Sequence, residues 1–279
     1  MGKHKVCFVG AGPGDPELIT LKAKRMIETA DVIVYSGSLL NPKLLDYAKK
    51  DAKSIDAAKI DREKIFEILR DAAKKGKFAI RLHDGDPALF SAIREQIDKL
   101  EQEEIKCEVV PGISALFAAA ARLNLELTLP GVTQTVIITR AELRTPVPDR
   151  ERISELAKHK STIAFYLSVH LTDHLVRELL AGGYPEETPA AVVYRASWDD
   201  ERVITGTLAD IGKKVRAARI TKTAIVIVGD VIQPKSYEYS KVYASSEVEY
   251  RKRFKNILKA DYKEHRPKRN SLFYTRPRK

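Results

Sequence analysis

The sequence predicts an α/β fold made of two α/β domains. Short apolar runs of strand length alternate with amphipathic stretches of helical spacing, which is typical of sheets covered by helices. Glycine-rich loops follow three of the apolar runs, at the position where open α/β sheets hold their ligands. A chain of 279 residues, 44% of them hydrophobic and 31% charged, is long enough for two modest cores and too charged for a membrane protein.

The first expected domain covers residues 1–123 and centres on the stretch FAIRLHDGDPALF at 78–90. Its apolar start predicts a buried strand, and Asp86-Pro87 has the chemistry of a helix start, with a carboxylate as N-cap and proline at the first helical position. Asp61 is expected to cap another helix. In order, the expected elements are a strand at 6–9, a helix at 17–28, a strand at 32–35, a helix at 61–74, a strand at 78–82, a helix from 87, a strand at 107–110 and an alanine-rich helix ending at 122.

Residues 124–132 contain Pro130-Gly131 and are expected to link the first domain to a second one at 133–234. The alternation resumes in that second stretch, and residues 235–279 form a basic C-terminal tail. The elements expected in the second domain are strands at 136–139, 163–167, 191–194 and 224–228, helices near residues 150, 171 and 208, and an antiparallel strand at 202–207.

The tail carries most of the net charge of +11. It holds 14 Lys and Arg against 5 Asp and Glu, which leaves 35 basic and 33 acidic residues before it. Two interpretations stay open for the tail. It is either a basic arm that binds nucleic acid through residues 243–279, or a solvated extension with one short amphipathic helix at 250–258.

The first glycine loop, Gly10-Ala11-Gly12-Pro13-Gly14-Asp15, has the glycine content of a dinucleotide fingerprint. Its third glycine comes one position early, Asp15 would repel a pyrophosphate, and Tyr35-Ser36 stands where a ribose-binding carboxylate is needed. No GK[ST] follows, which excludes a P-loop. We expect a tight structural turn capped by Asp15, and the pattern argues against a nicotinamide-dependent dehydrogenase.

The second and third loops lie at residues 83–87 and 110–115. Their glycines allow the backbone to approach a ligand closely, and Gly-Asp-Pro occurs both at 14–16 and at 85–87 after a predicted strand. His83 is expected to be a hydrogen-bonded side chain at a strand end, with proton transfer as the alternative. Asp86 is expected to cap its helix and to contact a ligand in addition.

Neither cysteine points to a disulfide or a metal site. Cys7 and Cys107 lie in apolar strand patterns without a second Cys or a His at ligand spacing, so both are expected to be core residues. The longest apolar run is shorter than a membrane span, and no signal-peptide pattern opens the sequence. We therefore expect a cytoplasmic protein without a metal.

Six segments, taken in order, resemble the tetrapyrrole methyltransferases, and the resemblance covers about residues 5–242. Within that family the chain is most similar to the enzymes that methylate C11 of precorrin-4 or cobalt-precorrin-4 in cobalamin biosynthesis. The segments ITRAELRTPVP and YSGSLLNP carry that likeness. The six segments are GAGPGDPELITLKAKRMIETADVIVYSGSLLNP, RLHDGDPALF, VVPGISALFAAAA, LPGVTQTVIITRAELRTPVP, AAVVYRASWDDERVITGTLADI and ITKTAIVIVGDVI.

The resemblance implies a homodimer that binds S-adenosylmethionine in a cleft between the two domains, with a polycarboxylate tetrapyrrole beside it. Methyl transfer from a sulfonium needs little acid or base help, so alignment and water exclusion are expected to do most of the catalysis, and alignment can contribute roughly 7 to 11 kcal/mol. No catalytic residue is assigned. At matching positions, the donor contacts would be Pro13, Gly85, Asp86, Leu89, Ser114, Ala115, Leu167, Tyr194, Arg195, Ala196, Thr223 and Ala224.

The substrate's carboxylates call for basic and hydroxyl groups, and the candidates are Ser36, Ser38, Arg140 and Arg144. Two segments depart from the family's pattern. Ala57-Ala58-Lys59-Ile60 stands where Ser-Ala-Gly-Met is usual, and Phe90-Ser91 stands where Tyr-Gly is common. If these positions line the substrate trough, the identity of the macrocycle is affected more than that of the donor.

Two other functions are alternatives. A different methyltransferase of the same fold, which acts on another precorrin position or on a protein as diphthine synthase does, would bind the same donor. A nucleic-acid-binding protein would bind RNA in a steeply salt-dependent way, and this binding would be lost on removal of residues 243–279.

Overall fold

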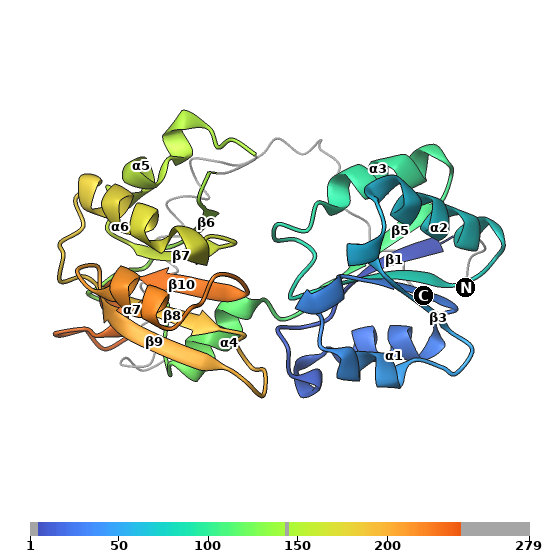
Figure 1. Ribbon diagram of the computed structural model, residues 1–279, viewed down its shortest axis with the longest axis horizontal. Helices are drawn as coiled ribbons and strands as arrows, with labels where there is room; N and C mark the ends of the chain where they lie inside the picture. The colour runs from blue at the N-terminus through green and yellow to red at the C-terminus, as the bar shows by residue number, and fades with distance from the viewer. Residues whose placement is uncertain (1–4, 143–144, 241–279) are drawn as a thin grey trace, which may run out of the picture. The chain divides into compact units, whose positions relative to one another are not determined.

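The computed structural model describes residues 5–142 and 145–240, apart from the side chain of Ser38. The part of the chain up to Ser236 forms one compact unit, and this unit holds two five-stranded sheets with their helices (Figure 1). Arg144 and the helix expected at 250–258 lie outside the described residues, so both expectations stay predictions.

The first sheet is parallel throughout, with the strand order β3-β2-β4-β1-β5. This confirms the parallel pattern predicted from the alternation of strands and helices. Because all five strands run in one direction, the loops that follow them leave the sheet at the same edge. The strands are β1 (Lys5–Gly10), β2 (Val32–Tyr35), β3 (Lys53–Asp56), β4 (Ala79–His83) and β5 (Lys106–Val110).

Helices cover both faces of the first sheet. On one face lie α1 (Leu21–Thr29) and the 3-10 helix η3 (Pro42–Tyr47), and on the other α2 (Arg62–Lys74) and α3 (Ile93–Gln102). The carboxylate of Asp61 accepts the Lys64 N–H at 2.7 Å, which confirms the predicted cap of α2. The result is a three-layer arrangement with an apolar core on each side of the sheet.

The second sheet is mixed, with the strand order β6-β7-β10-β8-β9. β6 (Val136–Arg140) and β7 (Thr162–Tyr166) are parallel to each other. The remaining strands, β10 (Ala224–Val228), β8 (Pro189–Tyr194) and β9 (Arg202–Thr207), are antiparallel to their neighbours. The antiparallel strand predicted at 202–207 is therefore confirmed.

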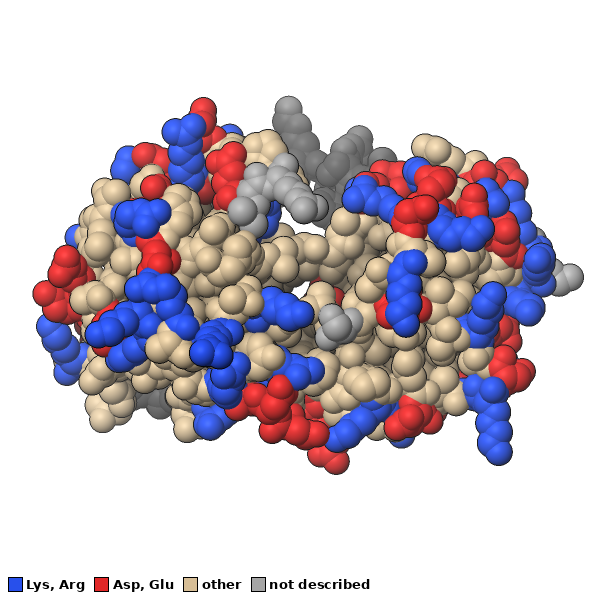
Figure 2. All heavy atoms as spheres, in the orientation of Figure 1, with Lys and Arg blue, Asp and Glu red and all other residues tan. Residues whose placement is uncertain are grey.

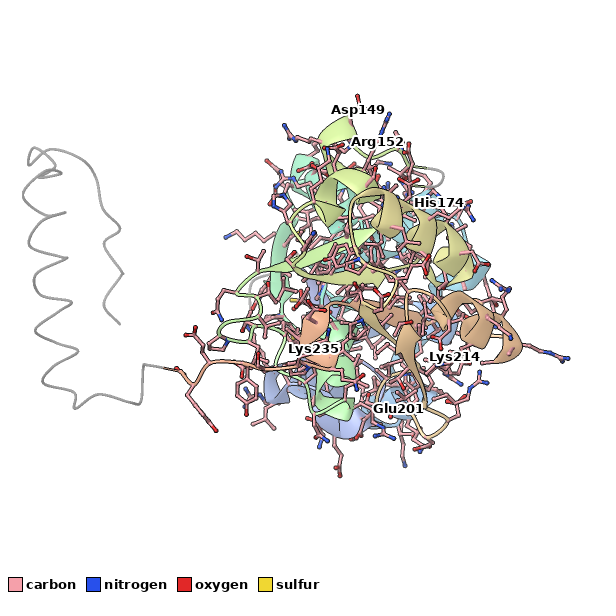
Figure 3. The ribbon with its side chains drawn as sticks, turned by 90° about the vertical axis from the view of Figure 1, so that its left-hand side faces the viewer. Asp149, Arg152, His174, Glu201, Lys214 and Lys235 are labelled. Atoms are coloured by element: carbon pink, nitrogen blue, oxygen red, sulfur yellow. The ribbon has the colours of Figure 1, made fainter. Side chains whose placement is uncertain are left out.

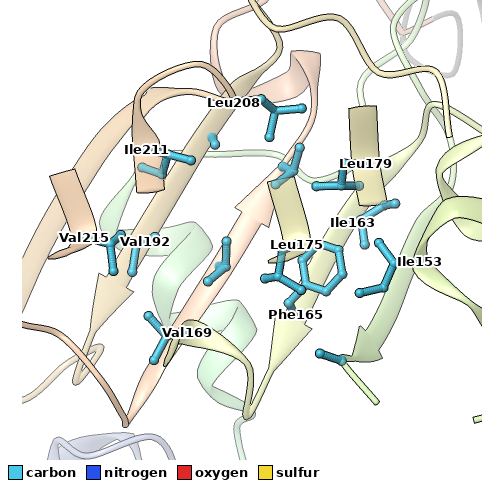
Figure 4. Packing of buried hydrophobic residues seen from close by; sticks show 14 of the residues in the cluster. Ile153, Ile163, Phe165, Val169, Leu175, Leu179, Val192, Leu208, Ile211 and Val215 are labelled. Atoms are coloured by element: carbon cyan, nitrogen blue, oxygen red, sulfur yellow. The ribbon is translucent and has the colours of Figure 1, made fainter. Parts of the chain in front are cut away.

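One face of the second sheet packs against α5 (Ile153–Ala157), α6 (Thr172–Ala181) and α7 (Ile211–Ala217). Figure 4 shows this core, in which Phe165 and Val192 of the sheet belong to the same cluster as Leu175, Leu179 and Val215 of the helices.

The opposite face of the second sheet is covered by α4 (Ala115–Arg122), whose Leu116 and Ala119 cluster with Ile225 and Ile227 of β10. Since α4 directly follows β5 of the first sheet, the chain changes from one sheet to the helix layer of the other before the predicted linker.

The helix predicted to begin at Pro87 is wrong, because residues 87–90 form turns and bends and α3 begins only at Ile93. One oxygen of Asp86 accepts the Ala88 N–H at 2.7 Å, but the other accepts the N–H of Gly112 at 2.9 Å. Phe90 and Ala92 take left-handed backbone angles, with φ of 54° and 48°, which a right-handed helix does not allow. Asp86 therefore closes a turn and joins two loops.

Two smaller differences concern the first half of the chain. The helix predicted at 17–28 is divided into η1 (Pro16–Leu18), capped by Asp15, and α1, which begins after its own cap Thr20. β3 was not predicted, because this edge strand contains a single apolar residue, Ile55. The remaining short 3-10 helices are η2 (Gly37–Leu39), η4 (Ala57–Lys59), η5 (Asp149–Glu151), η6 (Val169–Leu171) and η7 (Asp230–Ile232).

The surface carries charges of both signs. Figure 2 shows Lys and Arg interspersed with Asp and Glu over the visible face, in line with the near balance of charge before the tail. Ion pairs such as Asp149 with Arg152 at 2.6 Å, both labelled in Figure 3, lie on the outside and contribute little to stability.

Both cysteines are free, with Cys7 buried and Cys107 half-buried. Among residues 5–142 and 145–240, no three His, Cys, Asp or Glu side chains are grouped so as to hold a metal ion. Within the same described residues, no helix combines the length and the apolar character needed to cross a bilayer.

Candidate active site

A cavity of about 700 Å³ lies where loops from the two sheets converge. Tyr194 lies outside its wall, and the Arg202 guanidinium sits over the Tyr194 ring at 4.6 Å from the ring centroid. The structure thus brings together around one cavity most of the residues that were predicted to contact the donor. The contact of these residues with a donor stays a prediction. Eleven of the twelve predicted donor contacts line the cavity: Pro13, Gly85, Asp86, Leu89, Ser114, Ala115, Leu167, Arg195, Ala196, Thr223 and Ala224.

Glycines at the ends of β1, β4 and β5 allow three loops to touch. A Cβ on Gly10 would lie 2.5 Å from the Gly112 nitrogen, and a Cβ on Gly112 would lie 2.1 Å from the Gly85 carbonyl oxygen. Gly85 donates its N–H to the Gly12 carbonyl at 2.8 Å. These glycines are therefore required by backbone contact between loops, with Asp86 adding its two hydrogen bonds to the same junction.

The segment after β8 holds the first loop from the side of the second sheet. The Trp198 indole N–H donates to the Pro13 carbonyl at 3.0 Å, and Ser197 Oγ accepts the Asp15 N–H at 3.0 Å. The guanidinium of Arg195 lies over the Trp198 ring, 3.9 Å from its centroid. Gly14 makes room for this ring, because a Cβ there would lie 2.1 Å from Trp198 Cδ1. The two sides of the cavity wall are thus tied together.

Four residues of the cavity wall other than glycine have a left-handed backbone: Phe90, Leu167, Arg195 and Thr223, with φ of 54°, 54°, 48° and 54°. Such conformations cost on the order of 1 to 3 kcal/mol each and cluster at ligand sites. Phe90 and Leu167 also leave 44% and 59% of their surface exposed. Strained loop ends with exposed apolar side chains are typical of a binding site for a large organic ligand.

The hydroxyl of Tyr166 connects β7 to the start of α4. It lies 2.5 Å from Ser114 Oγ and accepts the Leu116 N–H at 3.1 Å. Burial raises the pKa of Tyr166 above its ordinary value, and its hydrogen bonds with Ser114 and Leu116 oppose this rise. The hydroxyl is therefore protonated at neutral pH and acts as a hydrogen-bonding group that fixes Ser114.

His83 lines the cavity as a buried, neutral ring. Burial, and secondly repulsion from Arg81, lowers the pKa of His83 to about 3. Its Nε2 is buried without a hydrogen-bond partner among the described residues. The prediction that His83 is hydrogen-bonded at this strand end is therefore wrong for Nε2. The ring stacks instead on Phe8, with 6.0 Å between centroids.

Arg81 is a cavity residue that the sequence interpretation did not single out. It is 8% exposed and lies in β4, opposite Phe8 of β1 and Val34 of β2. The signal that could have revealed it is a charged residue inside the otherwise apolar run of residues 78–82. Trp198 and Tyr166 were also missed, because an aromatic residue near a strand end gives no distinct signal in the sequence.

The four predicted substrate contacts have different locations. Ser36 lines the cavity and donates its hydroxyl to the Leu82 carbonyl at 3.1 Å. Arg140 lies outside the wall, and its guanidinium donates to the carbonyls of Ala141 and Thr145 at 3.1 and 3.0 Å. Arg144 and the side chain of Ser38 are not among the described parts of the chain. Of the six positions that depart from the family pattern, Ala57, Ala58, Phe90 and Ser91 line the cavity, whereas Lys59 and Ile60 do not.

The fold and the cavity define a class of protein that comparison with known protein families, sequences and structures identifies. A family model described as Tetrapyrrole (Corrin/Porphyrin) Methylases matches residues 5–212, and the chain belongs to this family. It is 56% identical over 255 residues to the cobalt-precorrin-4 C(11)-methyltransferase of Methanocaldococcus jannaschii, a match that covers 91% of this chain and 98% of the relative.

Two solved structures of the family are also similar. A cobalt precorrin-4 methyltransferase, described as a cobalamin biosynthetic enzyme, has a TM-score of 0.80 and 43% identity, over 82% of this chain and 96% of the other. Uroporphyrin-III C-methyltransferase of Thermus thermophilus, in complex with S-adenosylhomocysteine, has a TM-score of 0.70 and 29% identity, over 82% and 99% of the two chains. The predicted family and the two-sheet α/β fold are therefore confirmed.

Proposed function

We propose that this protein catalyses methyl transfer from S-adenosylmethionine to C11 of precorrin-4 or cobalt-precorrin-4, a step of cobalamin biosynthesis. The observation that carries the proposal is the 56% identity to a relative of that name over 98% of the relative's length. A cavity that gathers eleven of the twelve expected donor contacts supports the same function.

The residues of the cavity fit the donor. Residues of the loops at 85–89, 114–115, 195–196 and 223–224 line it, and Leu89, Leu167 and Phe90 supply apolar surface for a nucleoside. When bound, S-adenosylmethionine supplies a methyl group that its sulfonium already activates for attack by an electron-rich carbon. The chain therefore has to hold two ligands in line and keep water out, and alignment of this kind is worth roughly 7 to 11 kcal/mol.

The described residues act mainly by positioning. Asp86 fixes the second loop against the third through the Gly112 N–H at 2.9 Å, and Trp198 fixes the first loop through the Pro13 carbonyl at 3.0 Å. Tyr166 holds Ser114, which closes the side of the cavity next to α4. His83 is neutral and Tyr166 is protonated at neutral pH, so neither side chain adds a charge to the cavity, and His83 does not repel the cationic donor.

A homodimer, which the resemblance implies, and a cytoplasmic location, which the sequence predicts, form part of the proposal. β5 is an edge strand of the first sheet, and its Val109 exposes 41% of its surface, while Phe117 of α4 exposes 58%. Strand edges and exposed apolar side chains are features that a second copy can cover. Light scattering on the purified protein should give twice the chain mass of 31.3 kDa, and a mass of one chain would contradict the dimer.

The function is tested by incubating the protein with S-adenosylmethionine labelled with ¹³C in the methyl group and with each of the two macrocycles. We expect NMR to locate the label at C11 of one or both. A label at another carbon would make the protein a methyltransferase of the same fold with a different position of attack. No transfer to either macrocycle, under conditions where the donor binds, would contradict the proposal.

A further inference from the structure

The wall of the cavity contains a buried guanidinium whose positive charge is not paired with a carboxylate. Arg81 is 8% exposed, and its one hydrogen bond within the described chain runs from Nη1 to the Val34 carbonyl at 3.2 Å. Its Nε is buried without a partner. A guanidinium stays charged in proteins, and a buried charge is costly unless it is paired. The guanidinium of Arg81 is therefore available to pair with an anionic group of a ligand.

The surroundings of Arg81 confirm that its charge is not neutralised from within. Phe8 and Val34 lie beside it in the sheet, and an apolar cluster with α2 and α3 continues on the same face. The nearest acidic group in electrostatic terms is Asp84, which faces the cavity without forming an ion pair with Arg81. Burial lowers the pKa of Arg81 to about 10, and Asp84 offsets only part of that effect.

His83 adds a second unsatisfied polar atom next to the guanidinium. It follows Arg81 by two residues on β4 and therefore points to the same face of the sheet. The ring is 3% exposed, and its Nε2 has no partner in the described chain. Two neighbouring polar side chains, each more than nine-tenths buried and both lining the cavity, mark a place built for a polar ligand group.

The position of Arg81 in the cavity indicates which ligand carries that group. Arg81 lies between β1 and β2 in the sheet, and Ser36, Leu39, Ala57 and Ala58, which follow β2 and β3, line the same cavity. The predicted donor contacts come instead from the loops after β1, β4 and β5 and from the second sheet. The end of the cavity at β2 and β3 is thus left for the second ligand, and its small alanine side chains leave room for a ring substituent.

We propose that Arg81, with His83 beside it, binds a carboxylate side chain of the tetrapyrrole substrate. A guanidinium fork matches a carboxylate with two parallel N–H donors, and the neutral imidazole contributes one further polar contact. This inference rests on the proposed function, because it takes the second ligand to be a polycarboxylate macrocycle. The donor also carries a carboxylate, so the test separates the two sources.

The test compares Arg81→Met with the wild-type protein and with Arg94→Met as the matched control. Arg94 is an exposed arginine of α3 that pairs with Asp98 and lies outside the cavity wall. Three quantities are measured: the Kd of uroporphyrin III, a stable octacarboxylate macrocycle, by fluorescence; the Kd of S-adenosylhomocysteine by calorimetry; and the urea midpoint of the ligand-free protein. Arg81→Lys, which keeps the charge but loses the fork, serves as a second variant.

We expect Arg81→Met to weaken uroporphyrin binding by about tenfold to a hundredfold, the range for a hydrogen bond to a charged group. Binding of S-adenosylhomocysteine should stay within twofold, and Arg81→Lys should fall between the wild-type protein and Arg81→Met for uroporphyrin. The urea midpoint should rise, because the replacement removes a buried unpaired charge. A merely structural arginine would lower the midpoint when replaced, so the sign of the change separates the two roles.

Three results would overturn the inference. Unchanged uroporphyrin affinity in Arg81→Met would remove the carboxylate contact, and a loss confined to S-adenosylhomocysteine would assign Arg81 to the donor. A lowered urea midpoint in both Arg81 variants would make the arginine structural. If wild-type protein binds S-adenosylhomocysteine but no tetrapyrrole, the proposed function itself fails, and this outcome is distinct from the other three.

Discussion

The junction of the three glycine loops makes a quantitative prediction for Gly112→Ala. The new Cβ would lie 2.1 Å from the Gly85 carbonyl oxygen and 2.9 Å from the Gly10 Cα, whereas ordinary contacts of a Cβ begin at 3.4 Å. Both neighbours are backbone atoms at the ends of buried parallel strands, so neither can move without distorting the sheet edge. We expect a loss of about 3 kcal/mol in the free energy of unfolding, at the upper end of the overpacking range.

The same substitution should weaken donor binding. Relief of the clash has to displace the loop at 110–115 from Asp86, which accepts the Gly112 N–H at 2.9 Å, and Ser114 and Ala115 in that loop line the cavity. We expect the Kd for S-adenosylhomocysteine, measured by calorimetry, to rise at least tenfold, which corresponds to about 1.4 kcal/mol.

Gly76→Ala provides the matched control. Gly76 follows α2, has φ of +70°, and has nothing within 4 Å of an added Cβ. The substitution should therefore lower the free energy of unfolding only by the backbone strain, about 1 to 2 kcal/mol, and leave donor binding unchanged. Urea denaturation measures the stability of both variants. If Gly112→Ala were within 1 kcal/mol of the wild-type protein and bound the donor product equally well, the loops would not be packed as described.

Three further substitutions test single interactions. Asp86→Asn replaces an acceptor of two backbone N–H groups by an amide that can accept only with its oxygen, so the Kd for S-adenosylhomocysteine should rise about tenfold in calorimetry; an unchanged Kd would show that the loops hold without the carboxylate. Trp198→Phe removes the N–H donated to the Pro13 carbonyl, and urea titration should show a loss of about 1 kcal/mol; a loss near zero would count against this link. His83→Gln should change the pH dependence of unfolding. Because the pKa of His83 is about 3 in the folded protein against 6.5 ordinarily, the wild-type protein loses stability as the pH falls from 6.5 toward 3, by up to about 1.4 kcal/mol per pH unit. The difference between the wild-type and His83→Gln curves should show this slope, and parallel curves would mean that His83 titrates normally.

Elements with a clear local pattern could be predicted from the sequence. The strands at 32–35, 202–207 and 224–228 have the bounds expected from their apolar and β-branched residues. The helix α2 begins after Asp61 because its cap and its apolar spacing agree. In these segments, short-range chemistry and tertiary packing favour the same structure.

Elements that depend on distant contacts could not be predicted. Asp86 has the local chemistry of a helix cap, yet the N–H of Gly112, 26 residues away, takes one of its oxygens. β3 forms with little apolar character because β2 offers a free edge.

The candidate site divides in the same way. The glycine loops were found because their residues are adjacent in the sequence, and eleven of the expected donor positions line one cavity. Arg81, Tyr166 and Trp198 were missed because their place in the cavity depends on which strands become neighbours. A charge within an apolar strand is the local signal by which Arg81 could have been found.

The way α4 is shared between the sheets decides where the protein can be divided. The helix belongs by connectivity to the first sheet, but its Leu116 and Ala119 pack on β10 of the second. A fragment that ends after residue 123 would contain α4 but not the second sheet. The apolar face of α4 and the face of the second sheet that it covers would then both be exposed to water. Separate expression of the halves, or the exchange of one half for that of a relative, therefore has to keep α4 with the second sheet and residues up to Gly112 with the first.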